Sequence, residues 1–265
     1  MKTVTSEKSQ GERIESFNDF FSKQSRTYST ARPNYPDELF DFISSQASSH
    51  DVAWDCATGN GQAALSLVNH FKKVIATDAS ANQIKNAHKC ERVEYRITSA
   101  EDSGLDDESV DVITVATAVH WLDLTKFYKE VNRVLKDDGI IFVWSYADSK
   151  AEKKINDIMM GFAFGLLKDY WPKETKLAVD KYKSLHFPFA EITAPKFESR
   201  VMWNLEETVN YLMTWSSVQR YIEATNSNPL DHIMEDLISA WGYKFHKKEI
   251  SWDLYLKAGR KKKDS

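Results

Sequence analysis

Between Val52 and Trp144 the chain alternates between short apolar runs and segments with helical periodicity. Runs rich in valine and isoleucine predict strands, whereas apolar residues spaced three to four apart predict helices. The expected strands are Val52–Cys56, Val74–Asp78, Val93–Ile97, Val110–Ala116 and Ile140–Trp144, and the expected helices are Gln62–Phe71, Ala81–Cys90 and Leu124–Leu135. This alternation predicts a mostly parallel sheet with helices on both faces.

The pattern changes after Trp144. The segment Glu249–Leu256 alternates apolar and polar residues, which predicts a half-exposed strand. The region before it is rich in aromatic residues. It has helical patterns at about Lys150–Tyr170, Leu205–Glu223 and Asp231–Tyr243. Its one extended stretch is at Ile192–Trp203. We therefore expect an α/β fold with a Rossmann-like, seven-stranded sheet, a C-terminal antiparallel strand, and a helical insertion that forms a lid.

Four regions follow from this division. We expect an N-terminal helical lid segment at 1–50, a Rossmann-like core at 51–148, a mainly helical insertion with one strand at 149–248, and a final strand with a basic tail at 249–265. The net charge of −4 disfavours nucleic acid and anionic membranes as partners, and two cysteines are too few for a disulfide framework. The chain is expected to be cytoplasmic, to bind a small molecule and no metal, and to be a monomer or a weak homodimer.

The first expected strand contains Asp55 and leads into a turn with Gly59 and Gly61. Glycine lets the backbone bend tightly and approach a ligand, and the N–H groups at the start of the next helix carry partial positive charge. This turn predicts a site for a nucleotide-like cofactor. Because Gly59–Ala64 also fits the pattern G-x-G-x-x-A, a dinucleotide such as NAD stays open as an alternative.

Acidic residues follow two further strands. Asp78 ends the second strand, where a carboxylate can accept hydrogen bonds from both ribose hydroxyls, and Glu101 and Asp102 follow the third, where a carboxylate can accept from an adenine amine. Taken singly, these acids have structural alternatives as turn caps, helix starts or loop residues. The turn carries Asp55 and no nearby lysine or arginine, so a cationic cofactor such as S-adenosylmethionine fits better than a phosphate.

The segment Val52–Gln62 resembles motif I of class I S-adenosylmethionine-dependent methyltransferases. The resemblance covers about residues 17–260 and favours the small-molecule subgroup that includes trans-aconitate methyltransferase. It is also carried by Tyr28–Pro36, Ala118–Trp121, Leu135–Gly139 and, more loosely, Met213–Ser217. It implies S-adenosylmethionine as the cofactor and S-adenosylhomocysteine as the product.

The resemblance implies that Asp55, Gly59 and Gly61 contact the methionine part of the cofactor, that Asp78 binds the ribose, and that Glu101 or Asp102 reaches the adenine. The further cofactor-binding residues that it implies are Ala57, Gln62, Ala79 and Thr117. The family's first motif glycine is Ala57 in this chain. If the position requires positive φ, alanine costs about 1 kcal/mol or more there.

Methyl transfer is an in-line displacement that requires alignment and the exclusion of water. His120 is the candidate catalytic residue, as a base for a hydroxyl or a hydrogen-bond donor to a carboxylate, with a structural role as the alternative. The candidate substrate residues are Tyr28, Arg32, His120, Trp121, Trp144 and Trp215. We expect O-methylation of a small, partly apolar acid or hydroxyl compound. An NAD(P)-dependent oxidoreductase and a catalytically silent S-adenosylmethionine-binding protein remain the alternatives.

Overall fold

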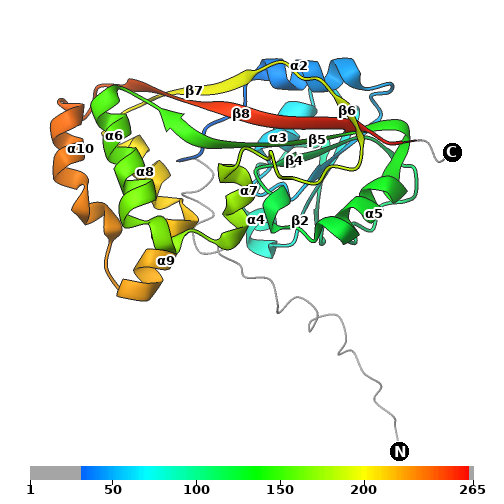
Figure 1. Ribbon diagram of the computed structural model, residues 1–265. Helices are drawn as coiled ribbons and strands as arrows, with labels where there is room; N and C mark the ends of the chain where they lie inside the picture. The colour runs from blue at the N-terminus through cyan, green and yellow to red at the C-terminus, as the bar shows by residue number, and fades with distance from the viewer. Residues whose placement is uncertain (1–30, 263–265) are drawn as a thin grey trace, which may run out of the picture.

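The computed structural model describes residues 31–262, which form one eight-stranded sheet with helices around it (Figure 1). The strand order is β3-β2-β1-β4-β5-β8-β6, and β7 pairs with β8 beside this path. Neighbours from β3 to β5 are parallel, whereas β8 is antiparallel to β5, β6 and β7. The strands are β1 (Val52–Cys56), β2 (Lys73–Asp78), β3 (Val93–Ile97), β4 (Val110–Ala116), β5 (Leu135–Lys150), β6 (Ala190–Ile192), β7 (Phe197–Trp203) and β8 (Lys248–Arg260). The predicted α/β fold with a C-terminal antiparallel strand is confirmed.

The insertion contributes two strands where the sequence predicted one. Pro195 lies between β6 and β7, and proline cannot donate a hydrogen bond to a neighbouring strand, so the extended stretch is interrupted there. β6 pairs with β8 at Ala258–Arg260, and β7 pairs with β8 at Lys248–Leu254. The described part of the sheet therefore has eight strands instead of seven.

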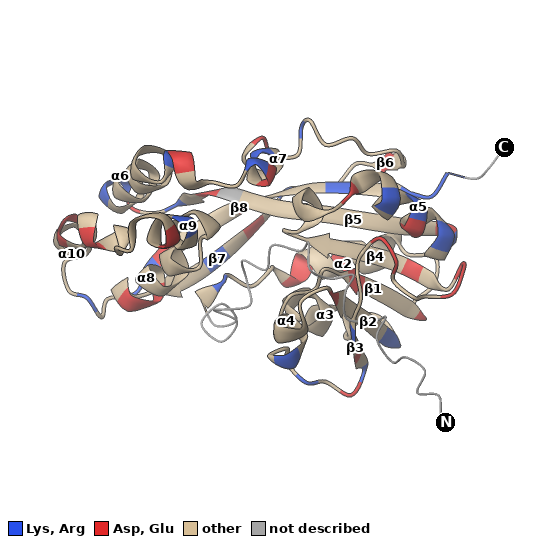
Figure 2. Ribbon diagram, turned by 90° about the horizontal axis from the view of Figure 1, so that it is seen from below, with Lys and Arg blue, Asp and Glu red and all other residues tan. Residues whose placement is uncertain are grey.

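Two apolar cores lie on opposite faces of the parallel sheet, because successive strand residues point to opposite sides. Ala53 belongs to the core that includes α2 (Asp37–Gln46) and α3 (Gln62–Leu67). Trp54 belongs to the other core, which is covered by α5 (Leu124–Val134). The helix between β2 and β3 is α4 (Ala81–Lys85). Charged residues lie mainly on the helices and loops, and the central strands carry few of them (Figure 2).

The helices of the insertion, apart from the one at Lys176–Val179, gather at one end of the long β5–β8 ribbon (Figure 1). The predicted helix at Leu205–Glu223 is two helices in the structure, which a break at Thr214 and Trp215 separates. The insertion's helices are α6 (Lys153–Gly161), α7 (Lys176–Val179), α8 (Leu205–Met213), α9 (Ser216–Thr225) and α10 (Met234–Trp241). Every helix within residues 31–262 is too short or too polar to cross a lipid bilayer.

Candidate active site

The turn after β1 has a left-handed backbone at three residues. The φ angles are +53° at Ala57, +59° at Gly59 and +90° at Gly61. Side chains with a Cβ are strained in this region, so Ala57 does occupy a position that favours glycine. A Cβ built on Gly59 would meet no atom within 4 Å, because this glycine lies at the edge of an open cavity. A ligand can therefore approach the backbone at Gly59.

Gly61 has a different role from the predicted contact with a cofactor. A Cβ built on Gly61 would lie 2.2 Å from the hydroxyl oxygen of Tyr95, which donates a hydrogen bond to the His88 carbonyl over 2.8 Å. Gly61 is outside the residues that line the cavity. The missing side chain thus makes room for the Tyr95 ring on β3.

Asp55 points into the protein and lies outside the cavity lining. Its carboxylate is fully buried and accepts hydrogen bonds from the hydroxyls of Thr58 and Thr114, the latter over 2.7 Å. Burial raises the pKa of Asp55 to about 6. Asp55 therefore ties β1, the following turn and β4 together, and it does not contact the space in which a ligand would lie.

Asp78 and Glu101, two of the predicted cofactor-binding residues, line the first cavity. Asp78 Oδ2 accepts a hydrogen bond from the Gly59 N–H and Oδ1 accepts one from the Ser80 N–H, both over 2.8 Å. Glu101 Oε1 accepts from the N–H of Asp123 over 3.0 Å. Asp102 is exposed and outside the cavity lining, so of the two candidates only Glu101 faces this space.

The first cavity lies at the carboxyl ends of β1 to β4, where α/β sheets commonly bind ligands. Of the predicted cofactor-binding residues, it is lined by Ala57, Gly59, Gln62, Asp78, Ala79, Glu101 and Thr117. A second cavity adjoins it. The two share Arg32, Thr117, Trp121 and Tyr146, so these four residues form a common wall.

Thr117 belongs to this wall and follows β4 with a φ of +55°. A β-branched residue is strained in this conformation, and such strain is found mostly at functional sites. The Thr117 N–H donates to the carbonyl of Trp144 over 2.7 Å, and its hydroxyl is 3.2 Å from that of Tyr35. These contacts hold the strained residue between the sheet and the segment before α2.

Arg32 joins three parts of the chain at the common wall. Its guanidinium donates to the Tyr146 hydroxyl over 3.0 Å and to the Thr214 carbonyl over 3.2 Å, and it lies 5.5 Å from the centre of the Tyr211 ring. A positive charge is thereby fixed beside both cavities. Tyr28, the other candidate from this segment, lies outside the described residues.

His120 lines the second cavity from the short helix that follows β4. Its ring is 8% exposed, and Nδ1 is 3.3 Å from the hydroxyl of Tyr182. Burial lowers the pKa of His120 to about 4. His120 is therefore neutral at pH 7 and is a weak base.

The three candidate tryptophans are not all in the site. Trp121 lines both cavities and Trp215 lines the second. Trp144 lines neither cavity. It is fully buried, with its ring 5.3 Å from that of Tyr35 and 6.3 Å from that of Phe40. Assigning Trp144 to the substrate pocket was wrong, because its position on β5 points it into the core.

The comparisons with known proteins agree with this arrangement. Residues 54–143 match the family described as a methyltransferase domain. A Dictyostelium discoideum protein named as a methyltransferase is 35% identical over 230 residues, which cover 85% of this chain and 87% of that protein. The chain belongs to the methyltransferase family.

Two further relatives extend the match. A solved structure described as a type II methyltransferase from Anaeromyxobacter dehalogenans is 35% identical with a TM-score of 0.80, and the match covers 86% of this chain and 97% of that one. A protein of Saccharomyces cerevisiae named as an S-adenosylmethionine-dependent methyltransferase is 27% identical over 159 residues, 57% of this chain and 55% of that protein. The predicted class and its cofactor, S-adenosylmethionine, are confirmed. The trans-aconitate subgroup stays a prediction.

Sequence reasoning missed several residues of the methyltransferase's second cavity. Tyr146, Asp148 and Ser149 line it from β5, where the pairing with β8 shifts register between Tyr146 and Ser149. Such a shift breaks the alternation of side chains, and it allows the neighbours Asp148 and Ser149 to face one space. Trp171 and Tyr211 also line the cavity, and the aromatic-rich insertion was their only sequence signal.

Proposed function

We propose that this methyltransferase transfers the methyl group of S-adenosylmethionine to an oxygen of a small organic molecule by in-line displacement. The observation that carries the proposal is the pair of adjoining cavities with a common wall at Arg32, Thr117, Trp121 and Tyr146. In-line transfer needs donor and acceptor in separate, fixed positions on one line, with water excluded. Two adjoining cavities with a common wall can hold the donor and the acceptor in such positions.

The first cavity has groups that suit the cofactor. The Asp78 carboxylate is placed to accept hydrogen bonds from ribose hydroxyls, the Glu101 carboxylate can accept from the adenine amine, and open space at Gly59 suits the methionine part. When bound, S-adenosylmethionine supplies an electrophilic methyl group on a sulfonium. The residues of the chain bind it, orient it and shield it from water.

The second cavity favours a carboxylate over a hydroxyl as the acceptor. A hydroxyl needs a base to remove its proton, and His120, with a pKa of about 4, holds a proton poorly at neutral pH. A carboxylate is already a nucleophile at that pH, and it gains from the positive charge of Arg32 at the common wall. Arg32 would position the acid, and neutral His120 would offer a hydrogen bond.

The insertion supports a small acceptor. Met160, Trp171 and Trp215 belong to region 149–248 and line the second cavity together with β5 residues, so the acceptor would be covered by this region. We propose that this region serves as a lid. A small molecule fits between the two layers, and we propose it as the partner.

Calorimetry with S-adenosylmethionine, S-adenosylhomocysteine and NAD(H) tests the cofactor, and transfer of a labelled methyl group to a panel of small carboxylic acids and alcohols tests the acceptor. We expect binding of the first two ligands and labelling of acids in preference to alcohols. Tight NAD binding without S-adenosylmethionine binding would contradict the proposal. Cofactor binding without transfer to any small molecule would instead favour a silent binding protein.

A further inference from the structure

A π-helical turn lies at the edge of the second cavity. The chain leaves α6 as η3 (Phe162–Leu166), and the N–H of Leu167 donates to the carbonyl of Phe162, five residues back, over 3.0 Å. Such turns are rare and concentrate at functional sites. The indole N–H of Trp171 donates to the Ala163 carbonyl over 2.8 Å, so a side chain of the cavity wall holds this turn in place.

The two phenylalanines of this turn differ in their exposure. Phe162 is 1% exposed, and its ring stacks on that of Trp215 at 6.0 Å. Phe164 is 46% exposed, yet it lines the second cavity. A half-exposed ring that lines a cavity lies at its rim, where a ligand would remove the ring from water and gain from its burial.

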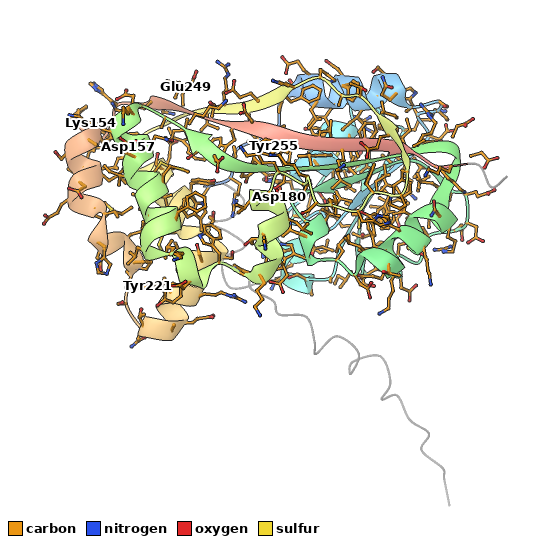
Figure 3. All side chains as sticks on the ribbon, in the orientation of Figure 1. Lys154, Asp157, Asp180, Tyr221, Glu249 and Tyr255 are labelled. Atoms are coloured by element: carbon orange, nitrogen blue, oxygen red, sulfur yellow. The ribbon has the colours of Figure 1, made fainter. Side chains whose placement is uncertain are left out.

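Behind this rim the cavity has a wall of packed aromatic rings. The centre of the Trp215 ring is 5.6 Å from that of Trp171 and 5.7 Å from that of Tyr211. The centre of the Tyr221 ring on α9, which is labelled in Figure 3, lies 4.9 Å from that of Tyr170, and this contact connects α9 to the segment after η3. These contacts fix the rings before any ligand arrives.

The second cavity combines polar residues, among them Ser145, Ser149 and Thr175, with aromatic ones. The common wall with the first cavity carries the Arg32 guanidinium and the Thr117 hydroxyl. Residues that line only the second cavity include Phe164, Trp171 and Trp215. The carboxylate of Asp148 also lines it, but its charge is compensated by the ammonium group of Lys181 at 3.3 Å. The aromatic residues that line only the second cavity thus offer ring faces that an apolar ring of a ligand can contact.

We infer that the methyl acceptor carries an apolar ring on the side away from its nucleophilic oxygen, and that Phe164 selects acceptors by contact with this ring. The inference rests on the proposed function, since it assigns the acceptor to the second cavity. Each contact between aromatic rings adds about 0.5–1.5 kcal/mol beyond burial, which corresponds to a roughly two- to twelve-fold preference. Phe164 supplies one such contact, and Trp171 and Trp215 supply others.

The test compares 3-phenylpropionate with hexanoate, two acids of equal charge, by calorimetry on the full chain with and without S-adenosylhomocysteine. We expect 3-phenylpropionate to bind at least about three-fold more tightly. Phe164→Ala should reduce this preference about three-fold or more, and Phe164→Leu should reduce it less. Phe245→Ala is the matched control, because Phe245 is 59% exposed and lines neither of these two cavities.

Equal affinity for the two acids, or binding of neither, overturns the inference. The inference also fails if Phe164→Ala keeps the preference of the unaltered chain, or if Phe245→Ala loses it equally. Failure of S-adenosylhomocysteine to bind would contradict the proposed function instead, because the two acids are also compared in its absence. Circular dichroism of each variant shows whether its fold is retained.

Discussion

Replacing Gly61 with alanine separates a structural role of this glycine from a role in ligand binding. The new Cβ would lie 2.2 Å from the Tyr95 hydroxyl oxygen, so the ring must move and its hydrogen bond to His88 is lost. That bond contributes about 0.5–1.5 kcal/mol, and left-handed strain at φ +90° adds about 1–2 kcal/mol. Alanine also lowers the conformational entropy of the unfolded chain, and this effect stabilises the folded state by about 0.4–1 kcal/mol. We therefore expect Gly61→Ala to lower the free energy of unfolding by about 2 kcal/mol.

Urea denaturation followed by circular dichroism measures this loss, and the same change in a Tyr95→Ala background is the control. There the obstructing ring is absent and only backbone strain remains, so the loss should be under about 1 kcal/mol. Affinity for S-adenosylmethionine should change little in folded Gly61→Ala protein, since Gly61 is outside the cavity lining. If stability is unchanged and affinity falls in both backgrounds, the glycine serves the cofactor and our reasoning is refuted.

Three other predictions concern the same site. Ala57→Gly should raise the free energy of unfolding by about 0.5 kcal/mol in urea titrations, because relief of left-handed strain exceeds the added freedom of the unfolded chain; a loss of stability would contradict this. His120 has a folded pKa of about 4, below its unfolded value of 6.5, so the unfolded state takes up the proton first and stability falls as pH drops from 6.5 to 4. His120→Gln should therefore lose less stability than the unaltered chain between pH 7 and pH 5, by about 2 kcal/mol, whereas parallel pH profiles would show that the histidine is not held neutral. Glu101→Gln should weaken binding of S-adenosylmethionine in calorimetry by about 1 kcal/mol or more, while the matched change at exposed Asp102 leaves it unaltered; equal effects would remove Glu101 from the site.

The sequence predicted β1, β2 and β4 well because they are largely buried and read as mostly apolar runs, whereas β3 (VEYRI) is only partly buried. The expected bounds of β1, β3 and β4 coincide with those in the structure. β5 extends six residues past the predicted end at Trp144, to Lys150. Its added part is polar in sequence and is held by pairing with β8, about a hundred residues further along the chain, as between Lys150 and Ser251. The local sequence pattern cannot predict pairing with so distant a strand.

Site residues were predictable by position along a strand but not by the direction of their side chains. Asp78 ends β2 and Glu101 comes after β3, and both line the first cavity. Asp55 sits one residue before the end of β1, and the pleat turns it inward toward Thr114. Trp144 is turned into the core on β5 in the same way. The aromatic residues of the second cavity come from segments that only the folded chain brings together.

The long strand β8 has consequences for how the protein unfolds. It pairs with β5 on one edge and with β6 and β7 on the other, and β5 carries Tyr146 of the common wall. Separating the parallel strands from β6, β7 and the insertion's helices therefore requires breaking the main-chain hydrogen bonds of β8. We therefore expect the parallel sheet and the insertion to unfold together, so that a substitution that destabilises the helical insertion also weakens cofactor binding without contacting the cofactor.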